Sequence, residues 1–146
     1  MVTSDSTKTP ARAFGAPGIE PRWTHSAKEG IGTAYHTSCH VWFTLSHGIL
    51  NEIYYPTVDQ PNTRDVQLLI TDGESFLHEE KRDLRHEVSY PERNCLLYQL
   101  VNSDPLGRYR IIKHVLADPH RSVVLMHVRL EVADISLRPK LKLYVL

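Results

Sequence analysis

Apolar and polar positions alternate with a period of two along most of the chain after Trp23, the pattern of β-strands with one buried face. In "SVVLMHVRLEV" one face is wholly apolar, and it consists of Val124, Met126, Val128, Leu130 and Val132. The other face becomes polar towards its end and carries Val123, Leu125, His127, Arg129 and Glu131. "VWFTL" places Val41, Phe43 and Leu45 together, and "LRPKLKLYVL" sets Leu137, Leu141, Leu143 and Val145 against Arg138, Lys140, Lys142 and Tyr144.

Turn signals separate these alternating segments and indicate how the strands connect. They occur at Thr71–Ser75, Asn102–Arg108 and Ala117–Ser122. Asp72-Gly73 between two strand-like segments predicts a hairpin, and Gly107 suits a turn residue with positive φ. About eight or nine strands with short links favour an all-β fold, an antiparallel β-sandwich. Glu79–Tyr90 has room for one helical turn.

The beginning of the chain differs in composition from the rest. Residues 1–13 are rich in Ser, Thr and Lys and predict a disordered tail, and Phe14–Pro21 is turn material. The start has no apolar core of the length that a secretory signal needs, and no apolar segment is long enough to span a membrane. The sequence therefore predicts a cytoplasmic protein.

Composition narrows the choice of partners. Lys and Arg together number 17, as do Asp and Glu, so no charge excess points to nucleic acid. Cys39 and Cys95 are the two cysteines, too few for a disulfide framework, and both are expected to be reduced. "LKLYVL" ends within an alternating segment, so we expect a free strand edge that favours self-association or pairing with another chain.

The segment His47–Asp65 holds the densest group of polar and aromatic residues. Its candidates for a domain interface or a substrate rim are Asn51, Glu52, Tyr54, Tyr55, Arg64 and Asp65. Glycoside hydrolysis needs two carboxylates facing each other across the scissile bond. Glu52 is better explained by bonds to neighbouring backbone or an arginine, and Asp59 by turn capping. Asp65 adjoins Arg64, and either could make an ion pair within the fold. No catalytic residue is therefore assigned.

The sequence also contains residues suited to sugar binding and to metal binding. Trp23, Tyr35, Trp42, Tyr54 and Tyr55 have the flat apolar rings that stack on sugars, although packing within the fold explains them as well. "YHTSCHVW" places two histidines and a cysteine close together, but no second cluster completes a tetrahedral set. No metal or other cofactor is predicted; calcium has no acidic loop of suitable spacing.

Long strings of the sequence resemble one family. "FGAPGIEPRWTHSAKEGIGTAY", "VWFTLSHGILNEIYYPTVDQPNTRDVQLLITDGESFLHEEKRDL", "GRYRIIKHVLADPHRSVVLMHVRLE" and "LKLYVL" are similar to the N-terminal domain of bacterial and archaeal glucodextranases and glucoamylases of glycoside hydrolase family 15. The resemblance runs from about residue 14 to residue 146. It implies a large antiparallel β-sandwich packed against an (α/α)6-barrel, of which this chain supplies roughly the first half.

The resemblance also implies that catalysis belongs to a different domain from this one. The family's barrel hydrolyses α-glucosidic bonds with inversion and contains both catalytic carboxylates, so the barrel is absent here and the chain alone is predicted to be inactive. In some relatives calcium is present. The leading hypothesis is a non-catalytic domain that supports a barrel in cis or in trans. The alternatives are a stand-alone carbohydrate-binding module that contacts α-glucan, and an assembly partner completed by strand pairing.

Overall fold

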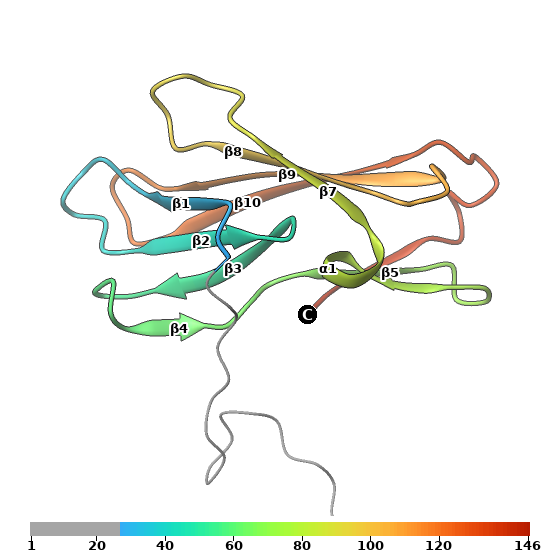
Figure 1. Cartoon of the computed structure of the whole chain (residues 1–146), viewed down its shortest axis with the longest axis horizontal. Coiled ribbons are helices and arrows are strands. Elements are labelled where there is room, and N and C mark those ends of the chain that lie inside the picture. Colours follow the sequence, from blue (N-terminus) through green and yellow to red (C-terminus); the bar gives the residue numbers. More distant parts are fainter. Residues whose placement is uncertain (1–26) are drawn as a thin grey trace, which may run out of the picture.

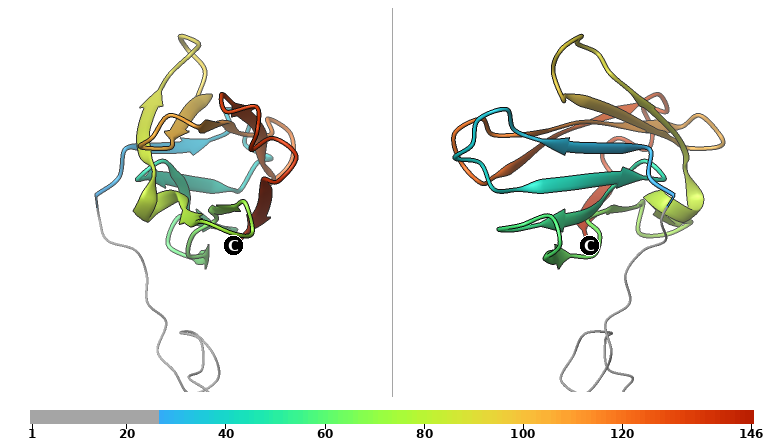
Figure 2. Two further views of the ribbon diagram at one scale, coloured as in Figure 1. Left: turned by 90° about the vertical axis from the view of Figure 1, so that its right-hand side faces the viewer. Right: turned by 60° about the vertical axis from the view of Figure 1, so that its left-hand side comes forward.

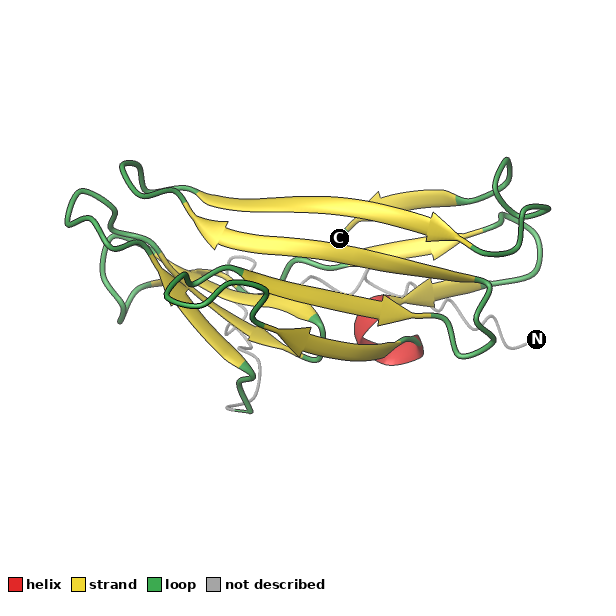
Figure 3. Cartoon of the chain, turned by 90° about the horizontal axis from the view of Figure 1, so that it is seen from above, coloured by secondary structure: helices red, strands yellow, loops and turns green. Residues whose placement is uncertain are grey.

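The computed structural model describes residues 27–146. The predicted tail at residues 1–13, the turn segment at residues 14–21 and Trp23 lie outside the described residues. Within the described part, nearly all regular structure is β, as the alternating pattern predicts, and α1 is a single short helix (Figure 3). This helix is too short and too polar to cross a membrane, and the described residues contain no candidate membrane-spanning helix.

Eleven strands and one helix follow one another in the described residues. Their bounds are β1 Gly30–Thr33, β2 Trp42–Ser46, β3 Ile49–Tyr54, β4 Pro61–Thr63, β5 Leu68–Thr71, β6 Leu77–Glu79, α1 Glu80–Asp83, β7 Arg85–Ser89, β8 Tyr98–Ser103, β9 Tyr109–Ala117, β10 Val124–Val132 and β11 Lys142–Val145. The number exceeds the expected eight or nine because β4 and β6 are only three residues long. Strands this short leave almost no alternation to detect.

The strands form three antiparallel sheets in two layers. One layer is the sheet β10-β9-β8-β7, and the other holds β1-β2-β3-β4 and β11-β5-β6. Figure 1 shows β8 and β9 along the top, with β2 to β4 beneath them on the left and α1 and β5 beneath them on the right. Figure 2 shows the two layers from other sides. The predicted antiparallel β-sandwich is confirmed.

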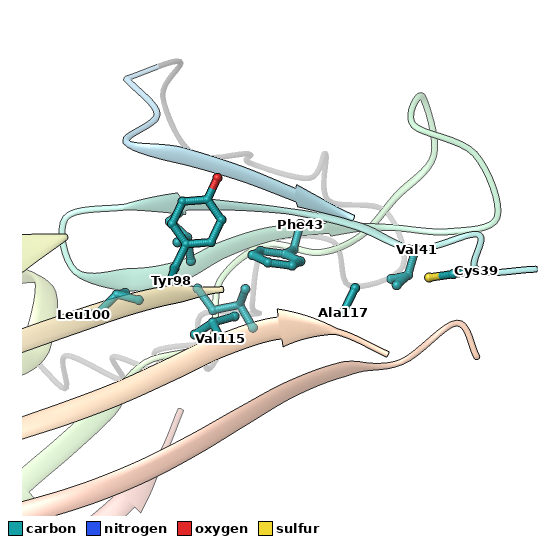
Figure 4. Packing of buried hydrophobic residues seen from close by; sticks show 9 residues of the cluster. Cys39, Val41, Phe43, Tyr98, Leu100, Val115 and Ala117 are labelled. Carbon is teal, nitrogen blue, oxygen red and sulfur yellow. The ribbon is translucent and has the colours of Figure 1, made fainter. Parts of the chain in front are cut away.

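Two hydrophobic clusters fill the space between the layers. The first joins the β1–β4 sheet to β8 and β9 and consists of Cys39, Val41, Phe43, Leu45, Leu50, Tyr98, Leu100, Val115 and Ala117 (Figure 4). The second joins the β5 sheet to β9 and consists of Leu68, Ile70, Leu84, Tyr109 and Ile111. The grouping of Val41, Phe43 and Leu45 on one buried face is confirmed.

Tyr98 connects the two layers directly. Its hydroxyl donates to the carbonyl oxygen of Ile31 at 2.6 Å and accepts from the Ile31 N–H at 3.0 Å. Gly30 and Gly32 make this approach possible, since a Cβ atom would lie 2.5 Å from the Tyr98 ring at Gly30 and 2.1 Å from the Phe43 ring at Gly32. The two glycines of "EGIGTAY" therefore serve aromatic packing rather than a turn.

The predicted turns are confirmed, and side chains hold them. β5 and β6 form the expected hairpin, in which Asp72 Oδ1 accepts from the N–H groups of Glu74, Ser75 and Phe76. Gly107 has a φ of 71°, and its N–H donates to the Asp104 carbonyl at 2.8 Å. The helical turn expected within 79–90 is α1, and the rest of that segment contains β7.

One predicted strand is wrong in its extent. Residues 134–140 form turns rather than a strand, and regular pairing begins only at Lys142. Hydrogen bonds to the Asp134 and Leu137 carbonyls shape these turns, and Pro139 lacks the N–H that a ladder needs. In β11 the predicted apolar face is not buried either, because Leu143 and Val145 are 37% and 74% exposed.

Candidate functional site

Of the six predicted site residues, three lie on β3, Tyr55 directly follows β3, and Arg64 and Asp65 directly follow β4. Ile53 pairs with Thr63, and Leu50 forms an isolated bridge with Val66. Between these two pairs, Asn51 and Glu52 on β3 lie beside Arg64 and Asp65. The tertiary structure therefore brings together residues that are separated by up to 14 positions in the sequence.

Glu52 is the centre of this group and is 5% exposed. Its Oε2 accepts from the Lys28 ammonium at 2.8 Å and from the Tyr54 hydroxyl at 2.6 Å. Tyr54 reaches it because residues two apart on a strand share a face. Among its partners, the sheet brings in a lysine 24 positions earlier in the chain, which the sequence did not indicate. Burial and the Glu52 carboxylate raise the pKa of Tyr54 to about 12.

Asn51 lies in a β-bulge. Phe43 of β2 faces Ile53 while Leu45 faces Leu50, so β3 holds one more residue than β2 over this interval. The bulge accommodates consecutive buried polar residues, and Asn51 is 1% exposed. Neither its Nδ2 nor its Oδ1 has a hydrogen-bond partner among the described residues.

Tyr55 and Arg64 present the exposed part of the group. Tyr55 is 49% exposed and precedes a cis peptide bond to Pro56. The Asn62 amide donates to the Tyr55 carbonyl at 2.5 Å, which fixes the backbone at the end of β3. Arg64 Nε lies 3.6 Å from Asp65 Oδ2, so the ion pair within the fold that is predicted for either residue joins the two. Tyr54, the last residue of β3, is partly buried, whereas Tyr55 is exposed.

A fully buried polar site was not predicted from the sequence. Glu80 and Lys113 are both fully buried, and Glu80 Oε1 lies 2.7 Å from the Lys113 ammonium. The Asn102 amide donates to Glu80 Oε1 at 2.6 Å and to the Gly48 carbonyl at 2.8 Å. Glu80 Oε2 accepts from the Leu68 N–H at 2.7 Å. Burial lowers the pKa of Lys113, and the Glu80 carboxylate opposes that shift.

A sequence signal for this site exists in β9. Alternation places Lys113 in the same inward row as Ile111 and Val115, where a charge must find a partner. The alternating pattern does not identify the partner of Lys113, because Glu80 is 33 positions away and belongs to a segment without clear periodicity. Only the packing of α1 against β5 and β9 identifies the pair.

A second polar cluster lies at the β8–β9 hairpin. Arg108 binds Asp104 through two bonds, Nε to Oδ2 at 2.7 Å and Nη2 to Oδ1 at 2.9 Å. This guanidinium holds the pKa of Asp104 below its usual range and lies 4.5 Å above the Phe76 ring. His78 Nδ1 is 2.7 Å from the Tyr109 hydroxyl, and burial raises the pKa of Tyr109. These contacts close the two hairpins against each other.

The histidine and cysteine candidates do not form a metal site in the described part of the chain. No group of three or more His, Cys, Asp or Glu residues there has a suitable arrangement. Cys39 is buried in the first cluster, while His36 bonds Ser38 and its ring lies 5.4 Å from that of His120. Cys39 and Cys95 are both free thiols.

Glycoside hydrolysis depends on where the carboxylates lie relative to one another. Of three cavities of about 400 to 490 Å³, one contains Glu131, one contains Glu92 and the third has no carboxylate. The buried carboxylates of Glu52, Glu80 and Asp104 are bound by Lys28, Lys113 and Arg108. These groups bond within the fold, and none of these three cavities brings together the two carboxylates that glycoside hydrolysis requires.

The sequence and the fold were compared with known proteins. Residues 13–146 match the family described as glucodextranase, domain N. The chain is 38% identical over 125 residues to a glucoamylase from Clostridium sp. (strain G0005), covering 86% of this chain and 18% of that protein. A crystal structure of bacterial glucoamylase complexed with acarbose has a TM-score of 0.82 and 38% identity, covering 91% of this chain and 20% of that chain. The chain thus spans about a fifth of each relative's length.

Proposed function

Since this chain belongs to the glucodextranase N-terminal domain family, we propose that it serves as the non-catalytic N-terminal domain of a glucan-hydrolysing enzyme of the glucoamylase type. The proposal rests on the share of this chain, and of the longer glucoamylases, that the matches cover. An N-terminal-domain family accounts for nearly the whole chain, while the matched region is about a fifth of the glucoamylases. Catalysis would then belong to a barrel domain, and this sandwich would support it.

The hydrogen bonds of the buried carboxylates are consistent with a non-catalytic role. A general acid and a general base need access to substrate and to water. Glu52 and Glu80 instead accept hydrogen bonds within the fold, from Tyr54 and from the Leu68 N–H among others. We therefore expect the purified chain to release no glucose from maltooligosaccharide or dextran. Release that survives a control for contaminating enzymes would contradict the proposal.

The contact with the barrel is proposed to lie on β3 and on the segments that directly follow β3 and β4, which hold the six site residues. Asn51, Glu52 and Asp65 would support the surface from beneath. Tyr55 and Arg64 are exposed enough to reach a partner, and both residue types are enriched at protein interfaces. The ion pair of Glu52 with Lys28 and its bond from Tyr54 would hold the neighbouring strand rigid for that contact.

A chimaera tests the partner and the surface together. This chain replaces the matching 125 residues of the Clostridium glucoamylase, and turnover of maltooligosaccharide is measured with thermal stability. Tyr55→Ala and Arg64→Ala are expected to lower the chimaera's stability or turnover, while Tyr35→Ala, a fully exposed tyrosine between β1 and β2, serves as the matched control. Unchanged stability and turnover in both test variants would remove this surface from the proposal.

Contact with α-glucan is a second candidate, and one observation favours it. Trp42 of β2 lies directly opposite Tyr54 of β3, and both alternate with residues that face the core. Two aromatic rings side by side on an outer face can stack on sugar rings. Titrating maltoheptaose into wild type and Trp42→Ala, by calorimetry, tests this role. Absence of saturable binding to the wild-type chain would count against it.

A further inference from the structure

Three polar side chains form a row across β8, β9 and β10. The strand register places Gln99 of β8 opposite His114 of β9, and His114 opposite His127 of β10. Lys113 and Val115, the neighbours of His114 in β9, are fully buried between the layers, so the row lies on the other face of the sheet. His114 and His127 are 13 positions apart in the sequence, and the register of β9 with β10 brings them together.

The bond between His114 and Gln99 determines which imidazole nitrogen of His114 is free. His114 Nε2 lies 3.1 Å from Gln99 Oε1. An amide oxygen only accepts, so Nε2 carries the proton and Nδ1 keeps its lone pair. This bond is made on the side of β9 away from β10, so it leaves the space between β9 and β10 to another ligand. Metal-binding histidines are held in the same way, with the second nitrogen donating to an oxygen.

His127 supplies a second imidazole beside the first. The centroids of the His114 and His127 rings are 6.2 Å apart, and the ring planes are inclined by 24°. His127 is exposed, and within the described chain its ring makes no hydrogen bond or ion pair. Imidazole nitrogens bind zinc at about 2.0–2.1 Å. A turn of the unrestrained His127 ring towards His114 therefore allows one ion to contact both residues.

The surroundings of this histidine pair favour a transition metal over calcium or magnesium. Calcium and magnesium take oxygen ligands, whereas imidazole suits zinc, nickel and copper. The row contains no carboxylate, and the amide oxygen of Gln99 already accepts from His114. Arg129 lies two positions beyond His127 on the same face of β10, but its guanidinium is bound to Glu131 at 2.9 Å. That carboxylate offsets the repulsion between the arginine and a bound cation.

We propose that His114 and His127 bind one divalent transition-metal ion between β9 and β10, with Gln99 orienting the His114 ring. Two protein ligands leave the remaining coordination positions to water. The bound ion stabilises the pairing of β9 with β10, because only the folded chain brings the two ligands together. The site lies in a different sheet from β3 and β4, so its test does not depend on the proposed function.

Calorimetric titration of the full chain, prepared without a polyhistidine tag, with nickel chloride tests the site. We expect one saturable site that binds copper more tightly than nickel, the usual order for nitrogen ligands, and that does not bind calcium. His127→Ala should abolish this binding. Gln99→Leu should weaken it by about tenfold, whereas Gln99→Glu keeps an oxygen acceptor for His114 and should retain it.

Two control variants separate this site from other metal-binding groups. His120→Ala is the matched control, because the His120 ring also lies beside a histidine, 5.4 Å from that of His36. His36 Nδ1 already accepts from the Ser38 N–H at 3.1 Å, so this second pair is not expected to hold the ion. Cys95→Ser removes an exposed thiol. Both controls should bind nickel as the wild-type chain does.

Placement of the ion is measured by nuclear magnetic resonance. Paramagnetic copper should broaden the backbone amide signals of His114 and His127 before those of His36 and His120. Circular dichroism checks that each variant is folded. A wild-type chain that binds neither nickel nor copper saturably overturns the proposal. So does binding that a folded His127→Ala leaves unchanged, or that His120→Ala or Cys95→Ser abolishes equally.

Discussion

Lys113 and Glu80 form an ion pair of 2.7 Å in which neither side chain is exposed to solvent. Lys113 lies in the inward row of β9 between Ile111, which belongs to one hydrophobic cluster, and Val115, which belongs to the other. Through Asn102 the pair is also connected to Gly48 in the β2–β3 turn. A polar contact therefore joins the two halves of the lower layer to the sheet above them.

Removal of one partner of this pair is expected to be strongly destabilising. Glu80→Gln leaves the Lys113 ammonium buried without its counter-charge, which costs about 3–5 kcal/mol in such pairs. Chemical denaturation measures the free energy of unfolding. The double variant Glu80→Leu/Lys113→Met should be more stable than Glu80→Gln, because apolar residues of similar volume often replace a buried pair without cost. Recovery should be partial, because the buried Leu68 N–H loses its acceptor. Equal instability of the double variant would contradict this account.

Tyr98→Phe tests the connection between the layers. The variant loses both bonds to the Ile31 backbone and should lower the free energy of unfolding by about 1–3 kcal/mol. Tyr144→Phe, which removes a hydroxyl from an exposed strand, is the matched control. A loss no larger than that of the control would show that the hydroxyl contributes nothing to stability.

The same variant should change alkaline denaturation. Burial and the bond from Tyr90 raise the pKa of Tyr98 from 10.0 to about 12. The unfolded chain therefore ionises first, and the stability that this tyrosine contributes below pH 10 is lost as the pH rises from 10 to 12. Unfolding curves in this range should fall less steeply for Tyr98→Phe than for wild type. Parallel curves would exclude this linkage.

Gly32→Ala is expected to destabilise the sandwich by overpacking. The added Cβ would lie 2.1 Å from Cζ of Phe43, a ring that is fully buried and cannot move aside freely. The expected cost is about 1–3 kcal/mol. Ile31→Ala changes the adjacent residue, which is 61% exposed, and should cost much less. Thermal unfolding compares the two, and similar melting temperatures would rule out the close contact.

Acid stability should depend on Asp104. The hydrogen bonds from Arg108 lower its pKa below the ordinary 3.8. The group therefore contributes stability that is present above pH 3.8 and is lost as the pH falls through the lower folded-state pKa. Asp104→Asn should reduce stability at neutral pH by about 1.5–3 kcal/mol and flatten the acid limb of the stability curve. An acid limb identical to wild type would refute this role.

The candidate site shows how far local sequence can lead. The density of polar and aromatic residues predicted a site within residues 47–65. The sheet does place Asn51 and Glu52 beside Arg64 and Asp65. The partner of Glu52 was not predictable, because Lys28 is 24 positions away and precedes β1. Nothing local specifies which distant cation a buried carboxylate will meet.

Alternation and turn residues determined by themselves the all-β class, the hairpins and the buried face of β2, because a strand's period of two and a turn's φ requirements are local properties. The division into three sheets was decided only by tertiary structure. The same holds for the Tyr98 bond to Ile31, 67 positions away, and for the burial of Lys113 against Glu80. These depend on which faces pack together, and a strand's pattern says that a face is buried without saying against what.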